Sequence, residues 1–261
     1  MTGRQRLVAG VVGACALLAV FAGCGAAPVA PPTAQQIYNN AMQSKMKDAS
    51  VTLTGTVATT TSGISLTLTM NGTGQVVLKP ANASHLTINA TISSAQINGT
   101  LTSDVITVGG YSYTKSNVQI PGIPTPPATL YTKAAAPDTS SSILPQVASN
   151  LVTVKEVGED TIRGDKCWHL TVTEYTDAQG TPVTSTTAGA TPFVADEWIR
   201  ESDYYYVRLK ASTLPGFSLP LGGTSTGSSG SAASNVGFTI DLSNYDSGVT
   251  IAPPPADQVQ S

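Results

Sequence analysis

Apolar and small polar residues alternate with a period of two over most of this chain. The clearest example is Ile64, Leu66, Leu68 and Met70, which alternate with serine and threonine. Side chains two apart on a strand lie on the same face of a sheet, so the pattern predicts strands with one apolar and one polar face. Short turns rich in glycine, proline and asparagine separate these runs and indicate an antiparallel sheet. We therefore expect a mostly β fold (α+β) of about 10 to 11 strands.

Two helices are expected beside the strands. Thr33 and Gln36 form a capping-box pattern ahead of a helix predicted over 34–47, and a second, short helix is predicted over 141–150. Ten strands about 4.8 Å apart make a sheet roughly 48 Å wide, which two helices of about 10 Å width cannot cover. A bare apolar face of that size is unstable in water. The sheet must therefore curl around this face, close over the helices or be filled by an apolar ligand.

The first 23 residues have the order of an export signal. Arg4 and Arg6 precede an uncharged run over 7–21, which is shorter than the roughly 20 residues that span a bilayer core. The run closes on two small residues and Cys24, which is typical of a bacterial lipobox. We expect cleavage before Cys24 and its lipidation; a plain signal peptide with an incidental cysteine is the alternative. The following segment, 24–32, is rich in proline and alanine and is expected to be an extended tether.

Composition limits the partners of the exported chain. We expect one domain over 33–255, with a flexible loop at 212–235 and a tail at 256–261. Removing the two signal arginines from 13 basic residues leaves 11 against 16 acidic ones, a net charge of −5. A weakly acidic surface argues against nucleic acid as a partner.

Side chains that could carry chemistry are few. Cys167 and His169 lie two apart on an expected strand and so share a face, where they could form a nucleophile with its base or half of a metal site. His85 is the only other histidine and is distant in sequence, so we favour a pair without chemistry. No enzymatic activity, cofactor or metal is expected. An acidic group near one hairpin is interpreted as a solvated hairpin end, not as a catalytic carboxylate pair: Asp196, Glu197, Glu201 and Asp203.

Several short motifs occur in a characteristic order. They are the lipobox at Cys24, the helix that runs into 50–55, a glycine hairpin with a tyrosine strand at 108–115, the segments 158–164 and 168–170, the segment 197–199, and 245–253. This layout resembles the LolA-like bacterial lipoproteins, most closely the LppX/LprG (LprAFG) type of lipid-binding lipoprotein. The resemblance implies a strongly curved antiparallel half-barrel with the two helices on its concave side and an apolar cavity for acyl chains. It also implies the transport of lipids or glycolipids across the cell envelope.

The strands and one loop supply candidate residues for such a cavity. Plain core packing requires the same apolar residue types, so the sequence does not separate core from ligand contact. Tyr204, Tyr205 and Tyr206 either rim a binding mouth or are ordinary strand aromatics. Four residues of the 212–235 loop are a candidate lid or membrane contact, or simply pack on the sheet edge: Leu214, Phe217, Leu219 and Leu221. The candidate cavity lining is Leu53, Leu66, Leu68, Val76, Leu86, Ile88, Ile97, Leu170, Val172, Phe238 and Ile240.

The sequence therefore predicts an exported lipoprotein, anchored by lipid at the outer face of the cell membrane. Its expected ligand is a lipid or glycolipid, which it would transport or present. The alternative is an envelope sensor or protein-interaction module on the same fold, with an envelope protein as its partner and no bound lipid.

Overall fold

The computed structural model describes the chain from residue 30 to residue 260, with internal gaps. The described ranges are 30–61, 64–79, 82–95, 98–124, 127–136, 152–176, 182–183, 191–211 and 235–260. The folded unit spans Pro32–Ser261. The signal, Cys24, Ile97, the second predicted helix and the four lid residues lie outside the described residues.

One helix, α1 (Ala34–Met42), one short 3₁₀ helix, η1 (Ala256–Gln258), and thirteen strands make up the described part of the chain. Eleven strands have five or more residues, which confirms the expected number, and two have only two residues. The strands are β1 (Asp48–Thr61), β2 (Ile64–Val77), β3 (Ala83–Ser94), β4 (Asn98–Val108), β5 (Tyr111–Gln119), β6 (Tyr131–Ala135), β7 (Val152–Ile162), β8 (Asp165–Thr176), β9 (Pro182–Val183), β10 (Thr191–Arg200), β11 (Tyr206–Ala211), β12 (Asn235–Ser243) and β13 (Val259–Gln260).

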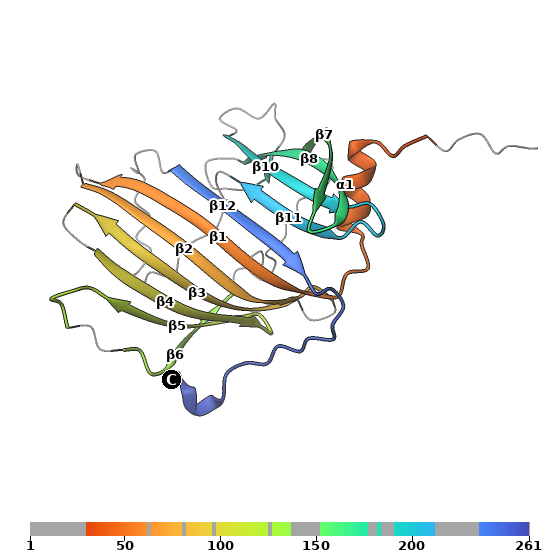
Figure 1. The fold of residues 1–261 in the computed structure, drawn as a ribbon. Helices are drawn as coiled ribbons and strands as arrows, with labels where there is room; N and C mark the ends of the chain where they lie inside the picture. Colours follow the sequence, from red (N-terminus) through yellow and green to blue (C-terminus); the bar gives the residue numbers. More distant parts are fainter. Residues whose placement is uncertain are drawn as a thin grey trace, which may run out of the picture. The chain divides into compact units, whose positions relative to one another are not determined.

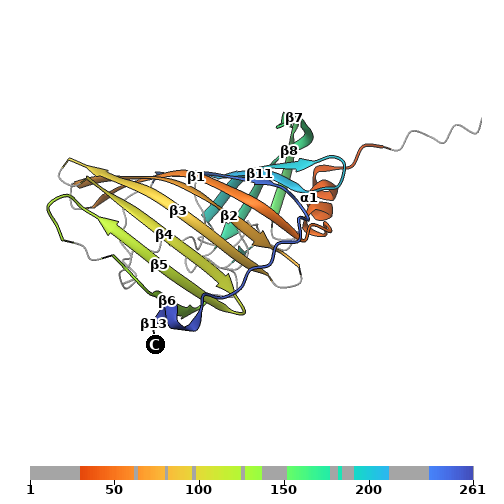
Figure 2. The ribbon, with the colours of Figure 1, turned by 60° about the horizontal axis from the view of Figure 1, so that its bottom comes forward.

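All of these strands belong to a single sheet. Its order is β13-β6-β5-β4-β3-β2-β1-β12-β11-β10-β8-β7, and β9 pairs with β8 beside this path. Neighbours are antiparallel except β13 and β6, which run parallel. Figure 1 shows how β12, from the end of the chain, lies between β1 and β11. In Figure 2 the last segment runs past the long strands to reach β6.

The predicted alternation of faces is confirmed. Leu53 of β1 pairs with Ile240 of β12 and with Gly72 of β2, whereas the neighbouring Thr52 is exposed. Buried apolar side chains of β1–β4, β8 and β10–β12 form one continuous core on one side of the sheet. We call this side the apolar face and the threonine-rich side the polar face.

Local signals define the start of α1, but not its end. The Thr33 hydroxyl accepts from the Gln36 N–H, and the Gln36 side chain accepts from the Thr33 N–H, which confirms the capping box. The helix ends at Met42 and not at 47 as predicted. Met46 is instead buried in the core, and the Lys47 carbonyl accepts from the Leu78 N–H at 2.7 Å. Tertiary contacts therefore override the helical pattern after Met42.

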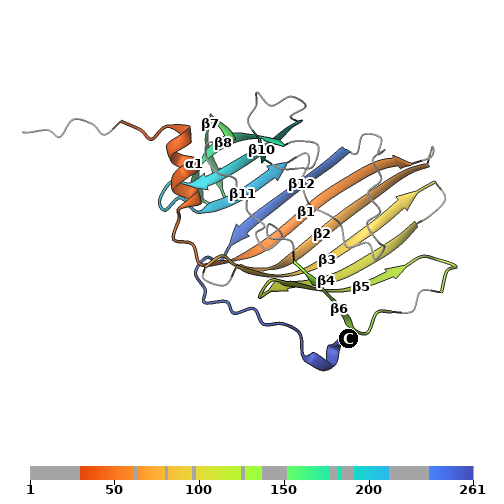
Figure 3. The same cartoon turned by 180° about the vertical axis from the view of Figure 1, so that it is seen from behind.

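The sheet is less curved than the predicted half-barrel. It is open, with β7 and β13 as separate ends of the strand order, and it is not strongly curled. Strong curvature was expected from the resemblance to the LolA-like lipoproteins, and curling was one of three ways to cover the apolar face. Large side chains of the face itself supply part of that cover: Met70 and Phe238 are buried beside Gly55. α1 does lie on the apolar side, where it packs on β7 and β10 (Figure 3).

A buried aspartate ties the two ends of the sheet domain together. Asp48, at the start of β1, accepts hydrogen bonds from the Ser247 N–H at 2.8 Å, the Ser247 hydroxyl at 2.9 Å and the Gly248 N–H at 3.1 Å. Asp246 in turn accepts from the Lys47 N–H at 2.7 Å and from the Tyr205 hydroxyl at 2.6 Å. These bonds hold the segment after β12 against the first strand.

The glycines of β2 make room for large neighbours on the apolar face. A Cβ on Gly74 would lie 2.0 Å from the His85 carbonyl oxygen and 2.8 Å from Leu86. Gly74→Ala is therefore expected to lower the free energy of unfolding by about 3 kcal/mol, measured by urea denaturation. Gly237→Ala on β12 is the matched control, because its Cβ would meet open space and should leave stability unchanged or slightly higher. Equal effects of the two substitutions would contradict this explanation.

Candidate functional site

The structure brings most of the predicted lining residues onto the apolar face. Leu66 and Leu86 are half-buried, and Leu86 packs against the main core. Ile97 lies outside the described residues. The remaining eight are buried in this one core: Leu53, Leu68, Val76, Ile88, Leu170, Val172, Phe238 and Ile240.

One row of this face crosses the sheet from strand to strand. Directly paired positions run Ile88, Gly72, Leu53, Ile240 and Leu209, from β3 to β11. The row is thus apolar over five neighbouring strands. At about 4.8 Å per strand, this stretch is roughly 19 Å wide.

Polar groups stand at both ends of this row. On β4, Ser103 is buried and its hydroxyl lies 2.8 Å from the Ser116 hydroxyl of β5, so the two share a hydrogen bond. At the other end, Glu197 of β10 pairs with Leu209 and with Leu170 of β8. The apolar row therefore ends in a hydroxyl pair on one side and a carboxyl group on the other.

Glu197 is the unusual one among the polar residues at the two ends of the apolar row. Its exposed fraction is 0%, and neither carboxyl oxygen has a hydrogen-bond partner in the described part of the chain. Burial raises its pKa to about 8, because an ionised carboxylate is poorly solvated there. The prediction that Glu197 belongs to a solvated hairpin end is wrong. Alternation places it with Ala195 and Ile199 on the apolar face, while Asp196 lies on the polar face.

Two tyrosines flank Glu197 from different elements. Tyr38 of α1 and Tyr206 of β11 are both buried, and both have a raised pKa, mainly through burial and further through the Glu197 charge. The Tyr206 hydroxyl donates to the Met42 sulfur at 3.6 Å, so it is not turned to the carboxyl group. Glu174 of β8 is nearly buried, and burial raises its pKa too. Glu197 thus lies where α1 meets the sheet, near the Tyr38 and Tyr206 phenol groups.

The three consecutive tyrosines do not form one rim. Tyr204 stacks on Trp168 with ring centroids 5.1 Å apart, and Tyr205 hydrogen-bonds Asp246. Tyr206 is buried in the core. Each ring is thus held by a different neighbour.

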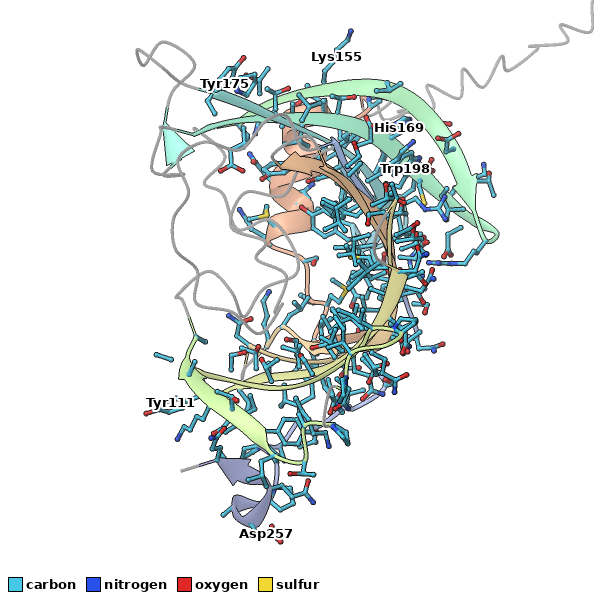
Figure 4. The ribbon with its side chains drawn as sticks, turned by 90° about the vertical axis from the view of Figure 1, so that its left-hand side faces the viewer. Tyr111, Lys155, His169, Tyr175, Trp198 and Asp257 are labelled. Atoms are coloured by element: carbon cyan, nitrogen blue, oxygen red, sulfur yellow. The ribbon has the colours of Figure 1, made fainter. Side chains whose placement is uncertain are left out.

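Cys167 and His169 share the polar face, as predicted. In Figure 4, His169 and Trp198 lie on the side of the sheet opposite α1. The His169 ring stacks on Trp198 at 4.3 Å and lies within 3.5 Å of carboxylates of Asp160 and Asp196. Cys167 is fully buried, and burial raises the pKa of its thiol to about 11. This geometry describes a packed aromatic cluster beside a buried thiol.

Surface hollows of the described residues are lined mainly by polar residues. One of about 490 Å³ is lined by Thr54, Thr69, Asn71, Asp196 and Lys210, and also by Gly55, Met70, Ala211 and Phe238 of the apolar face. Within the described ranges, no group of three or more histidine, cysteine or acidic residues could hold a metal ion. Nor does that part of the chain contain a helix long and apolar enough to cross a membrane.

Comparisons with known proteins find similarity in structure alone. No protein-family model matches the chain, and no curated protein matches it in sequence. LprF from Mycobacterium bovis is 14% identical, with 85% of this chain and 97% of LprF covered and a TM-score of 0.46. Lipoprotein LppX from Mycobacterium tuberculosis is 11% identical, with 84% and 97% covered and a TM-score of 0.44. A putative outer membrane lipoprotein-sorting protein domain from Vibrio parahaemolyticus is 9% identical, with 83% and 94% covered and a TM-score of 0.25.

The raised pKa of Glu197 predicts how stability changes with pH. Between the ordinary carboxyl value of 4.5 and about 8, the folded state holds a proton that the unfolded state has lost. Stability should therefore fall as pH rises through this window, by about 1.4 kcal/mol for each unit of effective shift. Urea denaturation at several pH values measures the slope, and Glu197→Gln should flatten it. An unchanged slope in that variant would assign the effect to other groups.

The buried thiol predicts slow chemistry at Cys167. With Cys15 and Cys24 replaced by serine, Cys167 is the sole thiol of the chain. Because the thiolate is the reactive form, a disulfide reagent near neutral pH should label the folded protein far more slowly than the urea-unfolded protein. Rapid labelling of the folded form would revive the nucleophile hypothesis.

Proposed function

We propose that the apolar face binds the acyl chains of a lipid or glycolipid, and that the protein transports or presents this ligand in the cell envelope. The site would be the row of paired apolar positions from β3 to β11. The proposal requires no catalysis, which agrees with the buried thiol at Cys167.

The observation that carries the proposal is the extent of the apolar face relative to its helix. The core continues through β4, β3, β2 and β1 to β12, β11, β10 and β8. α1 is only nine residues long and packs on β7 and β10, near one end of the strand order. Acyl chains suit such a face because each methylene moved out of water contributes about 0.8 kcal/mol.

The N-terminal pattern supplies the proposed location. Lipidation of Cys24 would anchor the domain at the outer face of the cell membrane, and 24–32 would be the tether between them. One acyl chain anchors a protein only weakly, whereas several chains hold it stably. The apolar half of the 212–235 loop, with Leu214, Phe217, Leu219 and Leu221, would serve as a lid or a membrane contact.

Lipid content after purification tests this function. A Cys24→Ser form, which carries no anchor lipid, should yield extractable lipid that mass spectrometry detects. Ala90 is buried on the apolar face of β3, opposite Met70 and Leu101. Ala90→Phe fills this space and should lower bound lipid about tenfold, equivalent to losing contact with two methylenes.

The neighbouring Thr91 provides the matched control. It is exposed on the polar face of the same strand, so Thr91→Phe adds the same ring without filling the apolar face. Thermal denaturation shows whether each variant folds, and Ala90→Leu replaces the larger change where folding fails. Lipid-free wild-type protein, or equal lipid in both phenylalanine variants, would refute the proposal.

A further inference from the structure

We propose that Glu197 is the polar contact of the bound lipid and receives a hydroxyl group of the ligand where α1 meets the sheet. This inference rests on the proposed function and identifies the ligand class as a neutral lipid with a free hydroxyl. Its acyl chains would lie along the row of the apolar face that runs from Leu209 to Ile88.

An unpaired carboxyl group is out of place in such a row. Glu197 lies between Leu209 and Leu170 by strand pairing, and both are fully buried. Buried polar groups in folded proteins nearly always have a hydrogen-bond partner, and an exception calls for an explanation. The Ser103 and Ser116 hydroxyls at the other end of the row follow this rule, since they bond each other at 2.8 Å. Glu197 alone of these groups lacks a partner in the described structure.

The neighbours of Glu197 are placed near it but do not satisfy it. Tyr38 and Tyr206 are close enough for the carboxylate charge to affect their titration, yet neither carboxyl oxygen accepts from them. The Tyr206 hydroxyl bonds the Met42 sulfur of α1 instead. The carboxyl group is therefore unpaired but fully buried at the boundary of helix and sheet, and a ligand group would reach it by displacing the contact between α1 and β10.

The protonation state selects the kind of ligand group. Burial keeps the carboxyl group protonated at neutral pH, since its pKa is raised to about 8. A protonated carboxyl donates one hydrogen bond and accepts others, and a hydroxyl group also does both. The positions that pair with Glu197 are apolar, and burying the charge of an anionic head group such as a phosphate among them would be costly. A hydroxyl of a diacylglycerol or of a sugar offers the matching chemistry.

Paired lipid probes test this contact. The Cys24→Ser protein is offered a diacylglycerol and its O-methyl ether, which has the same chains but lacks the donor. Wild-type protein should bind the diacylglycerol about tenfold more tightly than its ether, because the ether has no hydroxyl hydrogen to donate to the buried Glu197 carboxyl group. Glu197→Leu should bind both lipids with a ratio near one, whereas Glu197→Gln should keep part of the preference.

The outcomes separate this inference from the function on which it rests. Wild-type protein that binds neither probe overturns this inference, and the absence of extractable lipid from the same protein overturns the lipid-binding function as well. Binding of both probes without preference leaves that function standing and overturns the role of Glu197, as it would if an internal water satisfied the carboxyl group. If Glu197 had only a structural role, Glu197→Leu would change the affinities for the two probes by the same factor, and the preference of the wild-type protein would remain. Denaturation of each variant checks its fold, and the leucine variant should be at least as stable as wild type.

Discussion

The pairing of β1 with β12 joins the whole sheet. Strands β1 to β6 follow one another as a meander, and β7 to β11 form a second group. Among the strands that the structure describes, β12 alone lies against both. On β12, Ile240 pairs with Leu53 of β1 on one side and with Leu209 of β11 on the other. Without this strand, each group would end in an open edge and expose its share of the apolar face. The continuity of that face, and thus any site on it, depends on a contact between distant parts of the chain.

Asp48 stabilises this long-range contact. Three hydrogen bonds from Ser247 and Gly248 converge on its buried carboxylate, directly beside the β1–β12 pairing. A carboxylate that accepts several N–H and O–H bonds is well stabilised despite burial. Glu197 differs from it: Asp48 accepts three hydrogen bonds, whereas the fully buried Glu197 accepts none from the described residues.

Local patterns in the sequence were enough to predict the strands, their faces and the start of α1. The alternation around Leu53 and Leu68 and the capping box at Thr33 depend on neighbours within a few residues. The end of α1 depends on Met46 entering a core built by distant strands, so no local pattern reports it. The same holds for the β1–β12 register. The strong curvature implied by the family resemblance was overestimated, and large side chains such as Met70 cover part of the apolar face instead.

The candidate site was predicted in its apolar part and missed in its polar part. Because the acidic residues of this hairpin point to different faces of a strand and turn, Glu197 was predicted to lie in solvent with Asp196, Glu201 and Asp203. The available signal was the two-residue spacing of Ala195, Glu197 and Ile199, which places the acid on the buried side of β10. An acid at this position of the alternation points into the core, as the apolar residues on either side of it do.

Glu197 is informative about function because a leucine at its position would give equal or higher stability. Leu209 and Leu170 on either side show that the row accepts that side chain. Replacing a buried, unpaired acid with an apolar residue usually leaves stability equal or higher. Sites that act on ligands are the places where proteins retain such destabilising groups. A core residue and a ligand contact are indistinguishable when both are leucine, but a carboxyl group in the same row separates the two interpretations. It is thus the most informative side chain of the apolar face.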